Sequence, residues 1–486
     1  MEIKTVLIKP LLAVGLAVII LTGLSLSAGA IESYRETLAT GNQFFFRGDY
    51  AGAIQAFSQA IAIDPLSGLA FQKRGITYYR MDRHQDAIAD FSRALEVDVG
   101  DGVSLFYRGL SYFALAEFQK AIDDFDRAIE LNTQDAASYL YRGKSHEGLQ
   151  FFDQALADYT QALILNSRYG EALLARSSLL VRLNETEAAL ADFDRALILD
   201  PENPDIYRNR GNLHHQQGRL TQAIADYSRA IELRPDEAAL YFFRGSSQAA
   251  LREFSAAVDD YTKVLDLHPQ DRAAYVNRAA AFLALREYPR ALADFDRALA
   301  LGPPDAQLYF LRGVAHSEMR EFAQAITDYT RSLEIDPTQA AAYNNRGNAY
   351  FAGGQFAAAL ADFDRALTLD PEFADAWFNR GNTFNRLGRW RWAIHDYEKA
   401  LAIDPENPSY YFNLGLTHLS MGEARKARDL FTTAIAVNPR YRQAYYGRAL
   451  ANFSLERRRL AWEDIRKYEE LGGEPDPDFI SALRFN

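Results

Sequence analysis

Apolar and small residues recur at intervals of three and four along the chain from residue 33 onward, which is the spacing of an amphipathic helix. Pairs such as Gly353-Gly354 and Arg252-Glu253 interrupt this pattern at regular points. Each interruption separates two helical stretches of about a dozen residues. The sequence therefore predicts pairs of short helices joined by tight turns.

The whole pattern returns every 34 residues without an insertion. Its most regular position is a residue in the first helix that is Gly, Ala or Ser in every copy. The residues at this small position are Gly41, Gly75, Gly109, Gly143, Ser177, Gly211, Gly245, Ala279, Gly313, Gly347, Gly381, Gly415 and Ala449. We number the thirteen copies as repeats 1–13, from residues 34–67 to residues 442–475.

The second helix of each repeat has its own regular positions. Alanine stands 12 residues after the small position, and an aromatic residue stands 16 after it, except that repeat 13 has Ile465. Proline closes nine repeats and stops the helix, because it has no N–H to donate. Val99, Thr133 and Ser167 replace this proline in repeats 2–4, so we expect those helix ends to be less sharply fixed.

One such pair of helices cannot bury its apolar face alone, whereas stacked pairs can, so the pattern predicts an elongated solenoid. Aromatic-x-x-x-Gly in the first helix, with Ala-x-x-x-aromatic-x-x-Ala and Pro in the second, resembles the tetratricopeptide repeat over residues 34–475. The resemblance implies an all-α, right-handed solenoid superhelix of helix-turn-helix hairpins. It also implies a protein or peptide as the partner.

Charged residues vary together between the two helices of a repeat. An arginine precedes the small position in eleven repeats, and an aspartate follows that arginine by sixteen residues. In the two repeats without this arginine, the corresponding pairs are Thr40 with Ala56 and Leu414 with Leu430. Both members change together, which predicts an ion pair inside each repeat.

This pairing is a structural role and not a ligand site. Arginine suits it because the guanidinium group can bind a carboxylate through two parallel hydrogen bonds. Pairing with the arginine of the next repeat fits less well, because Arg74 would then face Ala56. Representative predicted pairs are Arg312 with Asp328, Arg346 with Asp362, and Arg380 with Asp396.

Composition limits the chemistry. The chain has no cysteine, a net charge of −12 and no long run of Lys or Arg, which makes nucleic acid an unexpected partner. His146, His214, His316 and His418 share one repeat position with Tyr and Phe, so we interpret them as packing residues. We therefore predict no enzyme activity, no cofactor, no metal site and no small-molecule substrate.

The N-terminus differs from the repeats. Lys4 and Lys9 precede an uncharged run over residues 11–30 that ends in Ala28-Gly29-Ala30. This predicts either a signal peptide cleaved after Ala30 or an uncleaved membrane anchor. In both cases we expect the protein to be exported to a periplasmic, lumenal or extracellular location, with residues 1–30 as its contact with the membrane. The remaining alternative is a cytosolic protein with an apolar first helix.

Candidate binding residues follow from the family resemblance. The positions two and three before the small residue, and the one after it, are expected to face the concave side. Many of them are asparagines, whose amides can pair with any peptide group: Asn209, Asn212, Asn344, Asn345, Asn348, Asn379, Asn382 and Asn413. The alternative is that asparagine is simply common at these helix positions.

Aromatic residues lie beside these asparagines. Phe310, Phe378 and Phe412 stand three residues before the small position, where they would either line the groove or pack between repeats.

Residues 476–486 predict a final helix whose Phe479, Ile480 and Leu483 cover the end of the array. We expect an exported scaffold that binds proteins or extended peptides in its concave groove. The alternative is an accessory or assembly subunit of a membrane or envelope complex that docks through its convex face or its ends.

Overall fold

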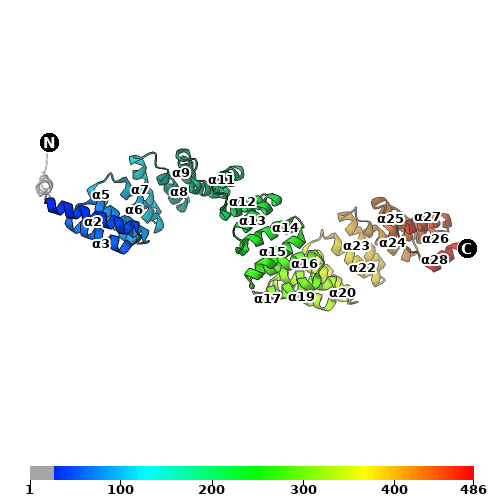
Figure 1. Ribbon diagram of the computed structural model, residues 1–486. Coiled ribbons are helices and arrows are strands. Elements are labelled where there is room, and N and C mark those ends of the chain that lie inside the picture. Colours follow the sequence, from blue (N-terminus) through cyan, green and yellow to red (C-terminus); the bar gives the residue numbers. More distant parts are fainter. Residues whose placement is uncertain (1–26, 486) are drawn as a thin grey trace, which may run out of the picture. The chain divides into compact units, whose positions relative to one another are not determined.

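The computed structural model describes residues 27–485, and all regular secondary structure in that range is α-helical (Figure 1). None of the helices within it is both long enough and apolar enough to cross a bilayer. The predicted export segment, residues 1–30, falls almost entirely outside this range, although Ala28 to Ala30 form the first turn of α2. The chain divides into two compact units, Met1–Gln217 and Gly218–Asn486, which are described separately below.

Unit 1 contains repeats 1–5 and the first helix of repeat 6. Its helices are α2 (Ala28–Phe46), α3 (Tyr50–Ile63), α4 (Gly68–Arg80), α5 (His84–Val97), α6 (Gly102–Ala114), α7 (Phe118–Leu131), α8 (Ala136–Gly148), α9 (Phe152–Leu165), α10 (Gly170–Arg182), α11 (Thr186–Leu199) and α12 (Pro204–Gln216).

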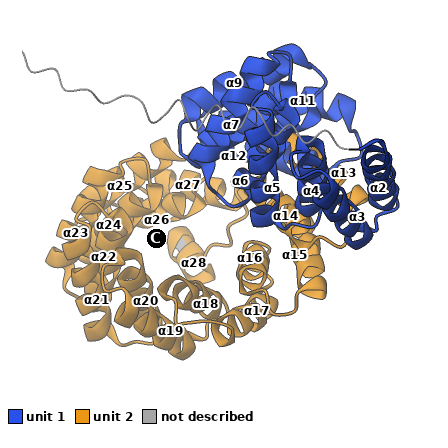
Figure 2. Cartoon of the chain, turned by 90° about the vertical axis from the view of Figure 1, so that its left-hand side faces the viewer, with its two compact units in different colours: residues 1–217 blue, residues 218–486 orange. Residues whose placement is uncertain are grey.

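Unit 2 contains the remaining helices of repeats 6–13 and one more helix. They are α13 (Leu220–Leu233), α14 (Ala238–Ala250), α15 (Phe254–Leu267), α16 (Arg272–Ala284), α17 (Tyr288–Ala300), α18 (Ala306–Glu318), α19 (Phe322–Ile335), α20 (Ala340–Ala352), α21 (Phe356–Leu369), α22 (Ala374–Arg386), α23 (Trp390–Ile403), α24 (Pro408–Ser420), α25 (Ala424–Val437), α26 (Arg442–Ser454), α27 (Arg458–Glu470) and α28 (Pro477–Phe485). Figure 2 shows the first helices of repeats 8–13 on the inner side of the curve of this unit and the second helices on its outer side. The predicted all-α solenoid of tandem hairpins is confirmed in each unit.

The turn inside each repeat has one residue with a left-handed backbone. These residues have φ between 56° and 80°, and they recur at the 34-residue period. They are Gly48, Asp82, Ala116, Gln150, Asn184, Gly218, Arg252, Arg286, Arg320, Gly354, Gly388, Gly422 and Glu456. Only five of them are glycine, the residue that adopts this conformation without a steric cost.

The helix ends that lack proline are as well defined as the others. Helices α5, α7 and α9 end at the same repeat position as α3, which does have a following proline. Asp98, Asn132 and Asn166 cap them, and each accepts a hydrogen bond from the backbone N–H two residues further on. This local turn fixes the end without proline, so the expected difference in repeats 2–4 is not found.

Close contact between paired helices explains the small position. A Cβ atom added to Gly347 of α20 would lie 2.7 Å from the ring of Phe363 in α21. The aromatic ring therefore lies directly against the backbone of the first helix. The aromatic position of the second helix supplies the largest fully buried side chains: Phe57, Phe91, Phe125, Tyr159, Phe193, Tyr227, Tyr261, Phe295, Tyr329, Phe363, Tyr397 and Phe431.

Helix α28 lies against repeat 13. Its Phe479 and Leu483 are buried in a cluster with Ala449, Ala461 and Ile465, and Ile480 packs at the margin of that cluster. The apolar end of the last repeat is thus covered by a segment that is not itself a repeat.

Candidate functional site

The arginine before the small position joins three helices. Arg346 in α20 donates two hydrogen bonds of 2.8 Å to the carboxylate of Asp362 in α21. Its remaining amino group donates a 3.0 Å bond to the hydroxyl of Thr330 in α19, which belongs to the preceding repeat. Arg346 and Asp362 are largely buried, with 16% and 8% of their side chains exposed. The hydrogen bonds to Asp362 hold the pKa of the Arg346 guanidinium above its usual value.

Ten repeats show the pair within the repeat. They include Arg312 with Asp328 and Arg380 with Asp396, whose bonds measure between 2.5 and 2.9 Å. The others are Arg74–Asp90, Arg108–Asp124, Arg142–Asp158, Arg176–Asp192, Arg244–Asp260, Arg278–Asp294 and Arg448–Asp464. Arg210 and Asp226 belong to different units, and their pairing stays a prediction.

A second contact, with the preceding repeat, adds to the predicted ion pair inside each repeat. All eleven arginines donate to a residue sixteen positions earlier. These acceptors are Ser58, Ser92, Asp126, Thr160, Asp194, Ser228, Thr262, Asp296, Thr330, Asp364 and Thr432. The arginines thus link adjacent repeats as well as paired helices.

Repeat 12, one of the two repeats without this arginine, replaces the ion pair by packing. Leu414 is buried in a cluster with Ala393 and Tyr397, and Leu430 lies at the margin of the same cluster. The polar contact is therefore absent together with both of its partners.

The side chain three residues before the small position packs against neighbouring helices and does not face an open groove. Asn344 is only 5% exposed, because its amide lies among neighbouring side chains. This corrects its placement as a groove-facing residue. Phe310, Phe378 and Phe412 are half-buried. Their rings lie 5.6 to 5.8 Å, between centroids, from the aromatic residue of their own second helix, which favours the packing alternative.

The asparagines of α20 and α22 form a chain of amides. Asn379 donates a 3.0 Å bond to the Asn344 side chain, which in turn donates a 3.3 Å bond to Asn345. Asn345 and Asn379 are half-buried and Asn348 is exposed. An amide network of this kind joins repeats 10 and 11 and leaves part of its surface accessible.

The remaining asparagines are each half-buried. Asn382 accepts a 2.8 Å hydrogen bond from the hydroxyl of Tyr397, and Asn413 donates a 2.9 Å bond to the backbone carbonyl of Ser409. Asn209 and Asn212 lie on α12, which belongs to unit 1, whereas the other asparagines belong to unit 2.

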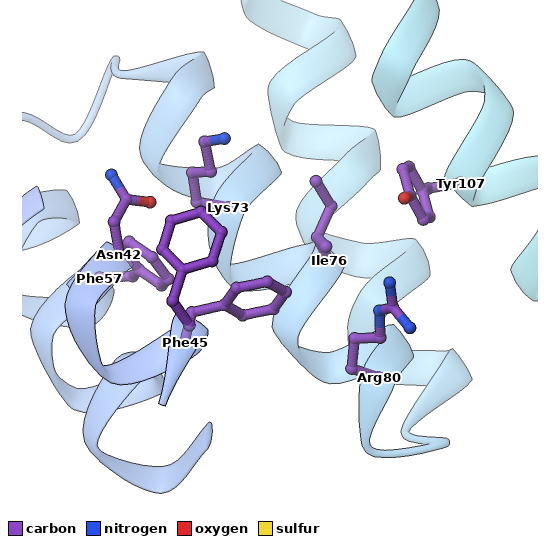
Figure 3. Close-up of a pocket in the computed structure, with 8 residues that line it drawn as sticks. Asn42, Phe45, Phe57, Lys73, Ile76, Arg80 and Tyr107 are labelled. Carbon is purple, nitrogen blue, oxygen red and sulfur yellow. The ribbon is translucent and has the colours of Figure 1, made fainter. Parts of the chain in front are cut away.

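A cavity of about 240 Å³ lies among the first three repeats. Its lining comes from α2, α3, α4 and α6, as Figure 3 shows for the labelled side chains. The lining residues are Asn42, Phe45, Phe46, Phe57, Lys73, Ile76, Arg80 and Tyr107. Four of them occupy the positions two before or one after the small residue: Asn42, Lys73, Ile76 and Tyr107. These are the positions that the family resemblance places on the concave side.

The cavity combines aromatic surface with unpaired positive charge. Phe46 is 84% exposed, which is unusual for a side chain of that size. Lys73 and Arg80 line the cavity, and no carboxylate does. Neither cation forms an ion pair with any residue in the part of the chain that the structure describes. An anionic group attached to apolar surface would fit this lining.

Sequence reasoning missed this cavity. It followed the asparagines of the later repeats, whereas the inward positions of repeats 1–3 carry Asn42, Lys73, Ile76 and Tyr107. The available signal was the run Phe44-Phe45-Phe46 at the end of a first helix, followed one repeat later by two cations without an acidic neighbour at helical spacing.

The histidines contact acidic side chains. The Nδ1 atom of His146 lies 3.0 Å from a carboxylate oxygen of Asp158. The corresponding distances are 2.7 Å from His316 to Glu321 and 2.6 Å from His418 to Glu423. Within residues 27–485, no group of three or more His, Asp or Glu side chains is arranged to hold a metal ion.

Two family models of the repeat match the chain. A model of the tetratricopeptide repeat matches residues 72–136, 140–204, 174–238, 242–306 and 412–469. A second model, of the TPR repeat, matches residues 41–82, 321–353, 347–388 and 381–422. No curated protein matches the chain.

Several solved structures are similar to it. The Cut9–Hcn1 hetero-tetramer of the APC/C has 15% identity, covers 90% of this chain and 98% of its own, and has a TM-score of 0.42. Yeast Tom70 has 16% identity, coverages of 94% and 99%, and a TM-score of 0.36. YrrB, described as a TPR protein with an unusual peptide-binding site, has 24% identity, coverages of 37% and 92%, and a TM-score of 0.33.

Proposed function

Since a model of the repeat matches more than half of its length, the chain belongs to the tetratricopeptide repeat family, and we propose that it is a scaffold that binds a protein partner through an extended peptide segment. The segment lies along the first helices of the repeats. Its recognition begins at the cavity of repeats 1–3.

One observation carries this proposal. Four of the eight residues that line the cavity occupy inward repeat positions, and Lys73 and Arg80 lie beside Phe45 and Phe46 without a compensating carboxylate. A partner segment that carries a carboxylate next to apolar side chains complements both features. Its acid would approach the two cations, and its apolar side chains would cover the exposed ring of Phe46.

The amide chain of repeats 10 and 11 supplies a second kind of contact. Asn345 and Asn379 keep part of their surface accessible while their neighbours hold them in place. An amide can both donate to and accept from a peptide group, so such residues bind a backbone without reading its sequence. We propose sequence selectivity at the cavity of unit 1, and backbone contacts at the amide chain of unit 2 as a separate surface.

The location of this activity is also a proposal. The basic start, apolar run and small residues of residues 1–30 support export from the cytoplasm, either as a cleaved signal or as an anchor. The test is to express the full chain and to compare the N-terminus and membrane retention of the mature protein with those of a Leu16→Arg variant. A variant that is exported as well as the wild type would contradict the proposal.

Selection from a random-peptide display library tests the binding site. We expect the wild-type chain to enrich peptides that carry Asp, Glu or a free C-terminal carboxylate beside apolar residues. The double variant Lys73→Ala/Arg80→Ala should bind the selected peptides at least tenfold more weakly, since it loses two cations from the cavity. Fluorescence polarisation with one labelled peptide measures the change.

A matched control comes from the same unit. Arg93→Ala/Lys120→Ala removes two exposed cations that lie on second helices and are paired with Glu96 and Glu117. This control should bind like the wild type. Equal losses in both variants, or selection of basic peptides, would overturn the assignment of the cavity.

A further inference from the structure

The turns between paired helices are strongly basic in the last three repeats. We call this surface the basic edge. Its cations are Arg386, Arg389, Arg391, Arg425, Arg457 and Arg458, and all except the half-buried Arg458 are exposed. None of these six forms an ion pair with any residue within the described range. Their concentration contrasts with the net charge of −12 of the whole chain.

The acids of this edge do not neutralise it. Glu423 is bound to Lys426 at 3.0 Å and to His418, and Glu456 occupies the turn of repeat 13. Six unpaired guanidinium groups therefore face solvent against very few carboxylates.

The basic edge also exposes two of the four tryptophans of the chain. Trp392 is 62% exposed and Trp390 is 40% exposed. The centroid of the Trp392 ring lies 6.1 Å from that of Phe384 in α22. Residues 386–392 are exposed without interruption, so within unit 2 no described segment covers these indoles.

Comparison between repeats shows that Trp392 is not required by the fold. No other repeat has an aromatic residue at its position. The equivalents are Gly52, Asp86, Lys120, Gln154, Ala188, Gln222, Ala256, Arg290, Gln324, Ala358, Lys426 and Leu460. The position tolerates small, polar and charged residues, and a large exposed indole there needs an explanation other than packing.

The start of α23 is also unfavourable for the helix itself. Seven repeats have Asp or Glu immediately before the second helix, where a negative charge suits the helix dipole. Repeat 11 has Arg389 there and Arg391 in the first turn, and no side chain caps the helix. In repeat 2, by contrast, the equivalent Arg83 is paired with Asp86 at 2.8 Å.

We propose that the basic edge docks on the surface of an anionic lipid bilayer. Arginines near such a surface are attracted to its headgroups, and tryptophan prefers the interface between headgroups and acyl chains. A turn on the surface offers a rigid protein partner little area to bury. The interface of a fluid bilayer can instead accommodate both indole rings at once. This contact lies in unit 2 and is additional to the one that the sequence predicts at residues 1–30.

Tryptophan emission of the full chain tests the proposal, because residues 1–30 contain no tryptophan and cannot report directly. With vesicles of phosphatidylcholine and phosphatidylglycerol at low salt, we expect a blue shift and quenching by brominated acyl chains. Vesicles of phosphatidylcholine alone should give neither change, and high salt should reverse both. In Trp390→Ala/Trp392→Ala the emission of the remaining tryptophans should not respond.

A pair of triple variants isolates the charges. Arg386→Gln/Arg389→Gln/Arg391→Gln should lower the partitioning that emission reports on the order of a hundredfold. The control Arg252→Gln/Arg286→Gln/Arg320→Gln removes the same charge from turns of the same unit, where each arginine is followed by a glutamate. Gln150 already occupies the equivalent turn position in repeat 4, so the control keeps a tolerated backbone.

The control triple should respond to anionic vesicles like the wild type. Equal effects of the two triples, or a response to neutral vesicles, would overturn the proposal. So would tight binding of soluble poly-glutamate or single-stranded DNA to the edge without any emission change on vesicles, which would assign the edge to a polymer.

Discussion

Arg346 can hold three helices because its guanidinium group has donors on two sides. One side binds Asp362 through two parallel bonds, and the remaining amino group reaches Thr330. The geometry uses the planar fork of arginine, which the ammonium group of lysine lacks. The same side chain therefore fixes the hairpin and its contact with the preceding repeat.

The contact of the arginine with the aspartate of its own repeat was predictable from covariation. So was its contact with the preceding repeat. Wherever the next repeat has the arginine, the position sixteen residues before it is Ser, Thr or Asp. The two exceptions at this position have no arginine to bind. Glu398 precedes the repeat that has Leu414, and Arg466 lies in repeat 13, the last repeat. The aspartate is the easier partner to recognise, because it lies in the same repeat as the arginine. The asparagines and phenylalanines were harder, because spacing alone did not separate the buried position of Asn344 from the half-buried position of Asn345.

A double-mutant cycle tests the pair at this scale. We expect Arg346→Leu or Asp362→Leu alone to lower the free energy of unfolding by about 3–5 kcal/mol, because each leaves a buried charge without its partner. The double variant should be more stable than either single variant, as Leu414 and Leu430 indicate. Chemical denaturation measures all three, and additive losses would remove the coupling that the contacts imply.

At the scale of the helices, the period fixes where each element begins. First helices from α4 onward start at the first residue of their repeat, with the bounds that the 34-residue alignment implies. The conformation of the turn was less visible, because eight of its thirteen residues are not glycine. These eight residues have a left-handed backbone that residues other than glycine adopt rarely.

Substitution at this turn should therefore stabilise the protein. Ala116 has φ of 58°, and replacing it by Gly should raise the free energy of unfolding by roughly 0.5–1 kcal/mol, since the steric cost outweighs the entropy of glycine. The midpoint of thermal unfolding measures the effect. The same change at Ala114, which ends α6, should lower the midpoint, because glycine weakens a helix.

The converse variant is Gly354→Ala, where φ is 75°. It should lower the midpoint by an amount similar to the gain at Ala116. If Ala116→Gly and Ala114→Gly shift the midpoint in the same direction, backbone strain at the turn is not the cause.

At the scale of the molecule, the repeats within each unit form a linear array in which each repeat contacts its neighbours. Stability in such an array is a sum of repeat terms and nearest-neighbour terms. The sequence predicted this architecture and the cap, because both follow from apolar faces that one hairpin cannot cover. It did not predict the division into two units, and the cavity of repeats 1–3 and the basic edge depend on single repeats that differ from the common pattern.

Hydrogen exchange of the full chain, measured by mass spectrometry, tests the central claim that the arginines join adjacent repeats. In Arg346→Leu we expect the largest loss of protection in α19, α20 and α21, the three helices that this side chain joins, with smaller losses further along unit 2. Thr330→Val should affect α19 and α20 while sparing the pairing with α21. Unchanged protection in α19, or a uniform loss throughout unit 2, would contradict the account.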